Sequence, residues 1–234
     1  MSQVTDNNKR IAKNTLLLYV RMLFMMIVSL YTSRVILNAL GVEDFGIYNV
    51  VGGVVAMFSV ISGSLSTAIS RFITFELGKG DQCKLNKIFS ASVTIQMLLS
   101  LIIVVLIFSI GVWFLNSKMT IPVDRIVAAN WVLQFSIVTF VINLISVPYN
   151  AEIIAHEKMS VFAYISILEV IGKLTIAFLI VVSPIDRLVF YAILMCLVAA
   201  VIRLTYTCYC RKHFEECTYH FCWDRTVSYT HLTL

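Results

Sequence analysis

The stretch Asn14 to Gly53, NTLLLYVRMLFMMIVSLYTSRVILNALGVEDFGIYNVVGG, indicates the fold class of this chain. Its first part is an apolar run long enough to cross a bilayer, which takes about 20 residues of helix. Two arginines, Arg21 and Arg34, interrupt the run. A charge at bilayer depth costs about 2.5 to 3.5 kcal/mol on insertion scales, so it needs a partner or a water-filled cavity. The stretch is therefore both a membrane anchor and a candidate functional region.

The composition extends this interpretation to the whole chain. Of the 234 residues, 59% are hydrophobic and 13% are charged, against about 45–50% and 25% in soluble domains. Apolar runs at about 14–40, 46–75, 88–115, 125–147, 160–183 and 188–208 predict six transmembrane helices, the fourth ended by Pro148. We therefore expect an all-α, polytopic membrane helical bundle, with a polar N-terminus at 1–13 and a polar tail at 209–234.

The distribution of basic residues predicts the orientation. No signal peptide is evident, because the residues before Asn14 are polar and the first apolar run is long and charged. Basic residues concentrate on one side of the membrane if both chain ends are cytoplasmic. That side then holds Lys9, Arg10, Lys13, Arg71, Lys79, Lys84, Lys87, Lys158, Arg203, Arg211, Lys212 and Arg225. The net charge of +5 is thus a topology signal, and we expect no nucleic-acid partner.

The cysteines and the known catalytic motifs favour neither a metal centre nor an enzyme. The six cysteines fall in predicted membrane or cytoplasmic segments, where thiols stay reduced. The spacing in the tail fits neither paired C-x-x-C motifs nor a zinc finger. That tail set comprises Cys208, Cys210, His213, Cys217, His220 and Cys222. H-E-x-x-H, G-x-S-x-G and the phosphate loop are missing from the sequence, so we expect no catalytic residues, no cofactor and no bound metal.

Two polar or small-residue stripes follow helical spacing. The second predicted helix carries Gly52, Ala56, Ser59, Gly63, Ser66 and Ser70 on one face, and small residues let helices approach closely. The fourth carries Ser136, Thr139, Asn143, Ser146 and Asn150. The first stripe indicates helix packing or a cavity wall. The second indicates either hydrogen bonding between helices or an aqueous cavity, and the two are compatible.

Charged side chains inside the predicted helices are the candidate ligands. Glu169 and Lys173 are four residues apart, which places them on one helix face; they form either a structural ion pair or a coupling and anion site. Arg21 and Arg34 are about 20 Å apart along a helix and point about 140° apart at 100° per residue. One straight helix therefore cannot aim both at one ligand, and each lies near enough to a membrane surface to snorkel. Guanidinium groups suit phosphate.

The segments SRVILNALGVEDFGIYNVVGG (33–53) and SGSLSTAISRFITFELGKGD (62–81) resemble the Wzx-type polysaccharide flippases, which are related to the multidrug and toxin extrusion transporters. The resemblance implies that the chain flips undecaprenyl-diphosphate-linked oligosaccharide across the bacterial inner membrane by alternating access. A basic cavity would then hold the diphosphate, and this gives Arg21, Arg34 and Lys173 a shared role. The implied partners are the bilayer, the lipid-linked oligosaccharide and the polysaccharide polymerase machinery.

The helix count departs from that family's pattern. Such exporters have two six-helix lobes facing a cavity, with 12 or 14 helices in all, so the six expected here form one lobe. We expect an N-terminal fragment that needs a second lobe or a second copy, with VSYTHLTL at 227–234 not the native continuation. Two alternatives remain: a cation-coupled multidrug exporter, which would rely on an intramembrane carboxylate such as Glu169, and a non-transporting scaffold in a polysaccharide-assembly complex.

Overall fold

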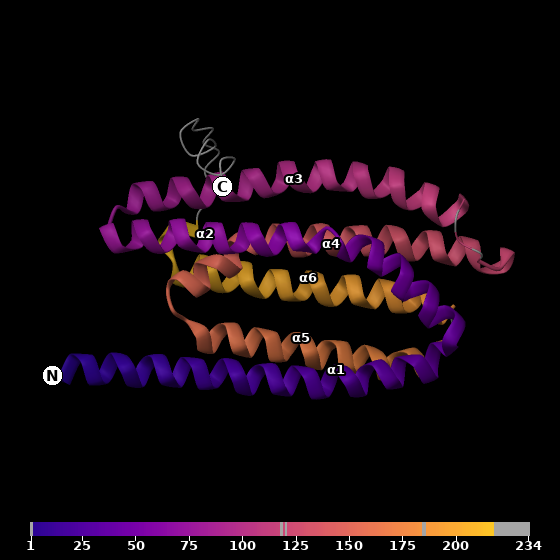
Figure 1. Ribbon diagram of the computed structural model, residues 1–234, viewed down its shortest axis with the longest axis horizontal. Helices are drawn as coiled ribbons and strands as arrows, with labels where there is room; N and C mark the ends of the chain where they lie inside the picture. The colour runs from indigo at the N-terminus through magenta and orange to yellow at the C-terminus, as the bar shows by residue number, and fades with distance from the viewer. Residues whose placement is uncertain (1, 118, 120, 184–185, 218–234) are drawn as a thin grey trace.

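The computed structural model describes residues 2–117, 119, 121–183 and 186–217, and regular structure within them is helical throughout. In chain order the elements are α1 (Ser2–Ala56), α2 (Ser59–Lys79), α3 (Gln82–Ser117), η1 (Val123–Arg125), α4 (Ile126–Ala155), α5 (Met159–Leu179), η2 (Ile180–Val182), α6 (Arg187–His213) and η3 (Glu215–Cys217). Figure 1 shows the long helices lying along one common axis. The predicted all-α helical bundle is therefore confirmed.

The stretch that opens the chain folds back on itself at one glycine. Within α1, Gly41 has φ 83° and ψ 168°, far from helical values. Only glycine adopts this region readily, because a Cβ would collide with the backbone. Figure 1 shows α1 bending near its C-terminal part and returning toward α2. We call the end of the bundle at this bend the Gly41 end, and the opposite end, where η3 lies, the Glu216 end.

The expected count of six membrane spans is wrong. Within the described residues, five helices are long and apolar enough to cross a membrane: Leu18–Ala56, Gln82–Leu115, Ile126–Ala155, Met159–Val182 and Arg187–His213. The helix expected at 46–75 is divided by a break at Met57 and Phe58 between α1 and α2. The remaining piece, α2, is rich in serine, threonine and glycine and carries Arg71 and Glu76, so it is not among the five.

The sequence predicted that Pro148 ends the fourth helix. In the structure Pro148 lies inside α4 instead. Proline removes one backbone N–H from the helical ladder and crowds the carbonyl one turn earlier. Membrane helices tolerate this where neighbouring helices pack around the irregular backbone. Pro148 is buried in the bundle, and the helix continues to Ala155. This extension brings Glu152 into the protein interior.

Helix α4 is the centre of the bundle and contacts α1, α2, α3, α5 and α6. Its Leu133 packs with Ile107 of α3 and Leu188 of α6 in a cluster of buried apolar side chains. Large apolar side chains also point outward, among them Leu101 and Phe108 of α3. Apolar side chains inside and outside are what a bilayer-embedded bundle requires, since lipid tails are as apolar as a leucine core. The chain is thus a multi-pass membrane protein.

Ion pairs join separate segments at the Gly41 end. The Arg125 guanidinium lies 2.8 Å from an Asp186 carboxylate oxygen and 3.4 Å from one of Asp44. Asp186 also caps α6, because its side chain accepts a hydrogen bond from the backbone N–H of Leu188 at 3.0 Å. Arg187 donates to the Ala39 carbonyl at 3.0 Å. These contacts hold the bend of α1 against the starts of α4 and α6.

Candidate functional site

Three residues from each of the two predicted stripes line one cavity of about 230 Å³. Parts of α1, α2, α4 and α6 line it: Tyr48, Gly52, Val55, Ala56, Ser59, Ser136, Thr139, Phe140, Asn143, Ala192 and Met195. The small residues of the first stripe make room, and the longer polar side chains of α4 face it. The sequence located each stripe, and the fold brings them together.

Two hydroxyls of the second stripe bond within their own helix, whereas Asn150 Oδ1 is buried without a hydrogen-bond partner among the described residues. Thr139 donates its hydroxyl to the Phe135 carbonyl at 2.8 Å, and Ser146 donates to the Ile142 carbonyl at 2.8 Å. Such bonds leave hydroxyl lone pairs free to accept from a ligand or water. Asn143 is exposed at the cavity, whereas Ser146 is not among the lining residues. The cavity can therefore accept hydrogen bonds from hydroxyl-bearing ligands.

Arg21 reaches across from α1 to α5. Its Nη1 donates to the Ser166 hydroxyl at 3.1 Å, and its guanidinium carbon lies 4.3 Å from the centre of the Phe162 ring. Its Nε is buried and has no hydrogen-bond partner among the described residues. Both contacts are with neutral groups, and no described carboxylate pairs with Arg21. The guanidinium therefore has no described carboxylate to neutralise it and has one unused donor, its Nε.

The pair expected on α5 is present. Lys173 Nζ lies 2.6 Å from Glu169 Oε1, and the two side chains are 41% and 35% exposed, so neither is sealed off. Tyr206 of α6 interacts electrostatically with both Glu169 and Arg21. The fold thus gathers Arg21 and Glu169 around one tyrosine. Whether the pair couples transport or only stabilises the bundle stays a prediction.

Arg34 is not part of this group. Its side chain is exposed, and no ion pair to it is found in the part of the chain that the structure describes. The angular separation estimated from the helix geometry placed Arg21 and Arg34 on different faces, and their surroundings indeed differ. A role for Arg34 in ligand binding stays a prediction.

The sequence placed Arg203 among the basic residues of the cytoplasmic side, and the structure places it beside the aromatic core. Its guanidinium carbon lies 5.6 Å from the centre of the Tyr149 ring. Its Nη1 is buried without a hydrogen-bond partner in the described ranges. Tyr149 and Tyr206 belong to one cluster of buried residues, against which Phe162 also packs. Arg203 and Arg21 therefore lie on the same aromatic cluster.

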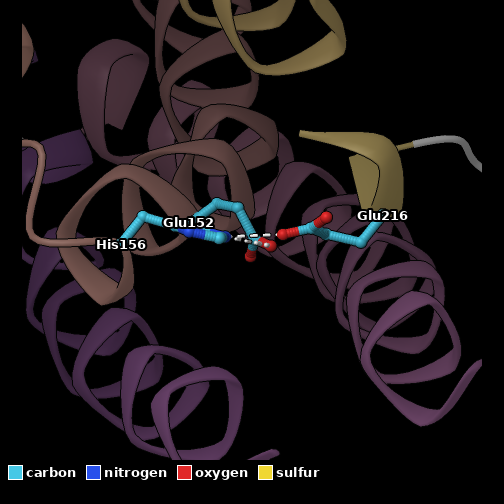
Figure 2. Close-up of side chains that lie close together, drawn as sticks. All are labelled: Glu152, His156 and Glu216. Carbon is cyan, nitrogen blue, oxygen red and sulfur yellow. Dashed lines mark hydrogen bonds and ion pairs between the residues drawn. The ribbon is translucent and has the colours of Figure 1, made fainter. Parts of the chain in front are cut away.

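A second polar group, at the Glu216 end, was also missed from the sequence. Figure 2 shows Glu152 and His156, at the end of α4, pointing toward Glu216 of η3. His156 Nε2 lies 2.5 Å from Glu216 Oε1 and 3.9 Å from Glu152 Oε1. The spacing of four between Glu152 and His156 was visible in the sequence, because it puts both on one helix face. Glu216, 60 residues further on, joins them only through tertiary structure.

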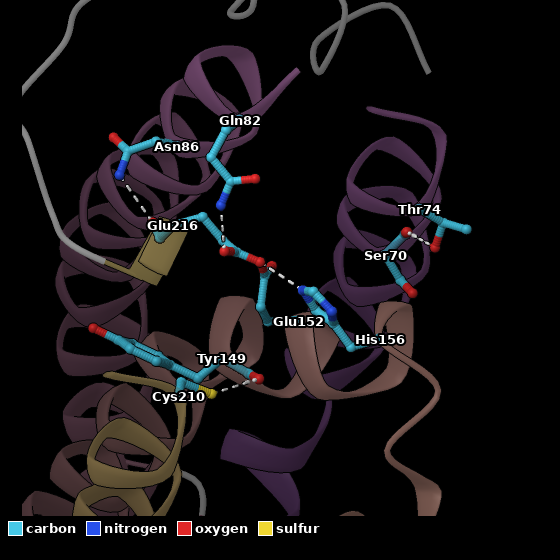
Figure 3. Close-up of polar contacts among 9 residues, drawn as sticks. All are labelled: Ser70, Thr74, Gln82, Asn86, Tyr149, Glu152, His156, Cys210 and Glu216. Carbon is cyan, nitrogen blue, oxygen red and sulfur yellow. Dashed lines mark hydrogen bonds and ion pairs between the residues drawn. The ribbon is translucent and has the colours of Figure 1, made fainter. Parts of the chain in front are cut away.

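Helix α3 and the segment around Phe214 hold this group in place. Gln82 donates to Glu216 Oε2 at 2.9 Å, and Asn86 donates to the Glu216 backbone carbonyl at 3.0 Å, as Figure 3 shows. The His156 ring stacks on Phe214 with centroids 4.1 Å apart. Burial would raise the pKa of the Glu216 carboxyl, but hydrogen bonds from its own backbone and from His156 outweigh burial and lower that pKa.

The sequence analysis rejected the cysteine and histidine residues of the tail as a metal centre. In the structure the described members of this set differ in burial. Cys208 and His213 are exposed, whereas Cys210 and Cys217 are buried. Cys210 donates to the Tyr149 carbonyl at 3.5 Å. Hydrogen bonding from Cys210, with burial, raises the pKa of the Cys217 thiol. His220 and Cys222 lie outside the described residues.

Five helices long and apolar enough to span a bilayer, packed into one bundle, define a multi-pass membrane protein. Residues 11–227 match the family described as "Polysaccharide biosynthesis protein", and the chain belongs to that family. It is also 24% identical over 123 residues to the "Uncharacterized membrane protein EpsK" of Bacillus subtilis (strain 168). That match covers 53% of this chain and 24% of the relative, so the chain spans only part of the relative's length. No solved structure matches this chain.

Proposed function

We propose that this chain is one lobe of a flippase for undecaprenyl-diphosphate-linked oligosaccharide. The observation that carries the proposal is the unneutralised positive charge inside the bundle, at Arg21 and Arg203. Lys173 is balanced by Glu169, whereas each of the two arginines has a buried guanidinium nitrogen without a partner among the described residues. A membrane protein keeps such charges where they face a ligand pathway.

A diphosphate fits these donors. Guanidinium binds two phosphate oxygens at once through parallel N–H groups, and such charge-assisted bonds are about twice as strong as neutral ones. Arg21 and Arg203 rest on the same aromatic cluster, which fixes their positions without neutralising them. The family membership supplies the sugar component, since polysaccharide biosynthesis requires a carrier-linked saccharide to cross the membrane. The role is transport, without catalysis.

The cavity between the two stripes is the proposed place for hydroxyl-rich cargo. Ser59, Ser136, Thr139 and Asn143 supply hydroxyl and amide groups there, which suit sugar hydroxyls. A cavity of about 230 Å³ is small for an oligosaccharide, so the proposal requires a second lobe, or a second copy of the chain, to complete the pathway. Alternating access of two lobes around a central site is the general mechanism of such transporters.

The proposed setting is the bacterial cytoplasmic membrane with the N-terminus inside, beside the polysaccharide polymerase machinery. The Glu216 end, which holds Lys79 and Lys84, is then cytoplasmic, as the distribution of basic residues favours. Reporter fusions at Gly80 and at Ser183 test this, because the two sites lie at opposite ends of the bundle. A periplasmic signal at Gly80 would contradict the orientation.

Surface-glycan complementation of a flippase-null strain by the full-length gene tests the function. Arg21→Ala removes a charge-assisted bond worth about 1.5 to 3 kcal/mol, so glycan should fall about 10-fold or more at equal membrane abundance. Arg21→Lys, which keeps the charge, should retain more glycan than Arg21→Ala. Lys87→Ala, on the exposed start of α3, is the surface control, and Arg34→Ala tests the predicted second contact.

The same assay separates the alternatives. Normal glycan from Arg21→Ala, together with retained pull-down partners, would favour a non-transporting scaffold. Normal glycan from Arg21→Ala but lost drug resistance in Glu169→Gln would favour a cation-coupled multidrug exporter. Competition of binding by a lipid diphosphate, and not by an organic cation, supports the flippase.

A further inference from the structure

The group at the Glu216 end contains one carboxylate, that of Glu152, without a hydrogen-bond partner among the described residues. Glu152 is completely buried, and neither of its side-chain oxygens has a hydrogen-bond partner within the described residues. An isolated buried carboxylate is costly, because burial strips its hydration. His156 lies 3.9 Å away, and its Nε2 is directed at Glu216 instead. Glu152 therefore points toward the pair of His156 and Glu216 without a hydrogen bond of its own among the described residues.

The three side chains bring metal-binding atoms together. One imidazole nitrogen and two carboxylate oxygens, from Glu152, His156 and Glu216, all lie within 4.8 Å of one another. Two carboxylates and a neutral imidazole carry two negative charges, which one divalent cation balances. A protonated histidine would balance only one. Imidazole favours zinc and its neighbours over calcium and magnesium, which prefer oxygen ligands throughout.

Neighbouring side chains hold Glu216 and His156 in place. Metal-binding carboxylates are usually held by hydrogen bonds from residues that do not touch the metal. Gln82 donates to the Glu216 oxygen that does not face His156, at 2.9 Å, and so aims the other oxygen into the group. Phe214 stacks on the imidazole and limits its rotation. Figure 3 shows Gln82 and Asn86 of α3 reaching Glu216 from one side of the group.

We propose that Glu152, His156 and Glu216 bind one divalent transition-metal ion of the zinc class. Zinc sites with three protein ligands keep a fourth position for water. His156 binds through Nε2, so metal binding replaces the hydrogen bond to Glu216 and leaves the ring proton on Nδ1. The ion links the end of α4 to η3 and, through Gln82, to α3. These three ligands are not members of the cysteine and histidine set of the tail, and the proposal does not depend on the flippase role.

Zinc titration of the full chain, purified in detergent with a tag that contains no histidine and stripped with chelator, tests the proposal. We expect one zinc per chain in the unsubstituted protein. Glu152→Gln keeps the shape of the side chain but removes its charge, and should weaken binding by at least about 10-fold. Glu43→Gln, on the exposed surface at the Gly41 end, is the matched control and should bind as the unsubstituted chain does.

Two further measurements keep the test decisive if Glu152→Gln folds poorly. Gln82→Ala touches no metal ligand atom but loses the bond to Glu216, so it should bind zinc about 10-fold more weakly at unchanged helix content. Cobalt(II) should give the visible spectrum of nitrogen and oxygen ligands. Thiolate-to-cobalt absorption, no zinc uptake at millimolar concentration, calcium binding without zinc binding, or unchanged affinity in Glu152→Gln would each overturn the proposal.

Discussion

Replacing Gly41 by alanine should destabilise the bundle through the backbone alone. A Cβ added at Gly41 would meet no atom within 4 Å, so the substitution creates no collision with the rest of the protein. Its φ of 83° and ψ of 168° nevertheless lie in a region that is almost exclusive to glycine. Holding another residue there costs about 1 to 3 kcal/mol. Gly41→Ala should therefore lose about that much free energy of unfolding.

Gly53 provides the matched control in the same helix. A Cβ there also meets nothing within 4 Å, but Gly53 lies in the helical part of α1 after the bend. Alanine favours helix over glycine by about 1 kcal/mol. Gly53→Ala should thus be neutral to about 1 kcal/mol more stable, opposite in sign to Gly41→Ala.

Reversible unfolding of the two variants in detergent, followed by circular dichroism, measures both values. The bend matters for the fold because it turns α1 back toward α2 and places Tyr48 and Gly52 at the cavity. A Gly41→Ala variant as stable as the unsubstituted chain would show that the bend is not held at this conformation. Equal losses in both variants would show that the effect comes from helix packing instead of the backbone angle.

Two further predictions concern helix ends and helix packing. Asp81 caps α3 by accepting from the Lys84 backbone N–H at 3.1 Å, and its side-chain bond with Lys84 lowers the Asp81 pKa below the ordinary 3.8. The stabilisation by ionised Asp81 is therefore complete above the ordinary pKa of 3.8 and is lost as the pH falls through the lower folded pKa. Asp81→Ala should thus destabilise the chain at pH 7 but not at strongly acidic pH. An equal loss of stability at both pH values would contradict this prediction. A Cβ on Gly172 would lie 3.2 Å from Val198 on α6, so Gly172→Leu should cost about 1 to 3 kcal/mol in the same unfolding assay, whereas Gly63→Leu, with open space, should not.

Helical class and membrane character followed from the sequence because they depend on local composition. An apolar run of sufficient length forms a helix in lipid wherever it occurs, since the backbone has no other way to satisfy its hydrogen bonds. The spacing of four between Glu169 and Lys173 likewise predicted their contact, observed at 2.6 Å. Pro148 shows the limit of local reasoning, because its effect on α4 depended on the helices packed around it.

The candidate sites were only half visible in the sequence. Each stripe could be read from helical periodicity, but the meeting of Gly52 with Ser136 at one cavity depends on how α1 bends and where it packs. The sequence placed Arg203 only on the cytoplasmic side, and its position over Tyr149 comes from the contact between α4 and α6.

By itself the sequence determined a helical membrane protein with arginines in its first span and two polar faces, because burial in lipid and helical periodicity act within a few turns of chain. The tertiary structure alone decided which faces meet, which arginine lies beside the aromatic core, and that Glu216 joins Glu152 and His156. Contacts of this kind join segments as far apart as 148 residues, as between Arg187 and Ala39. They are set by side-chain packing across the whole bundle, and no local pattern encodes that packing.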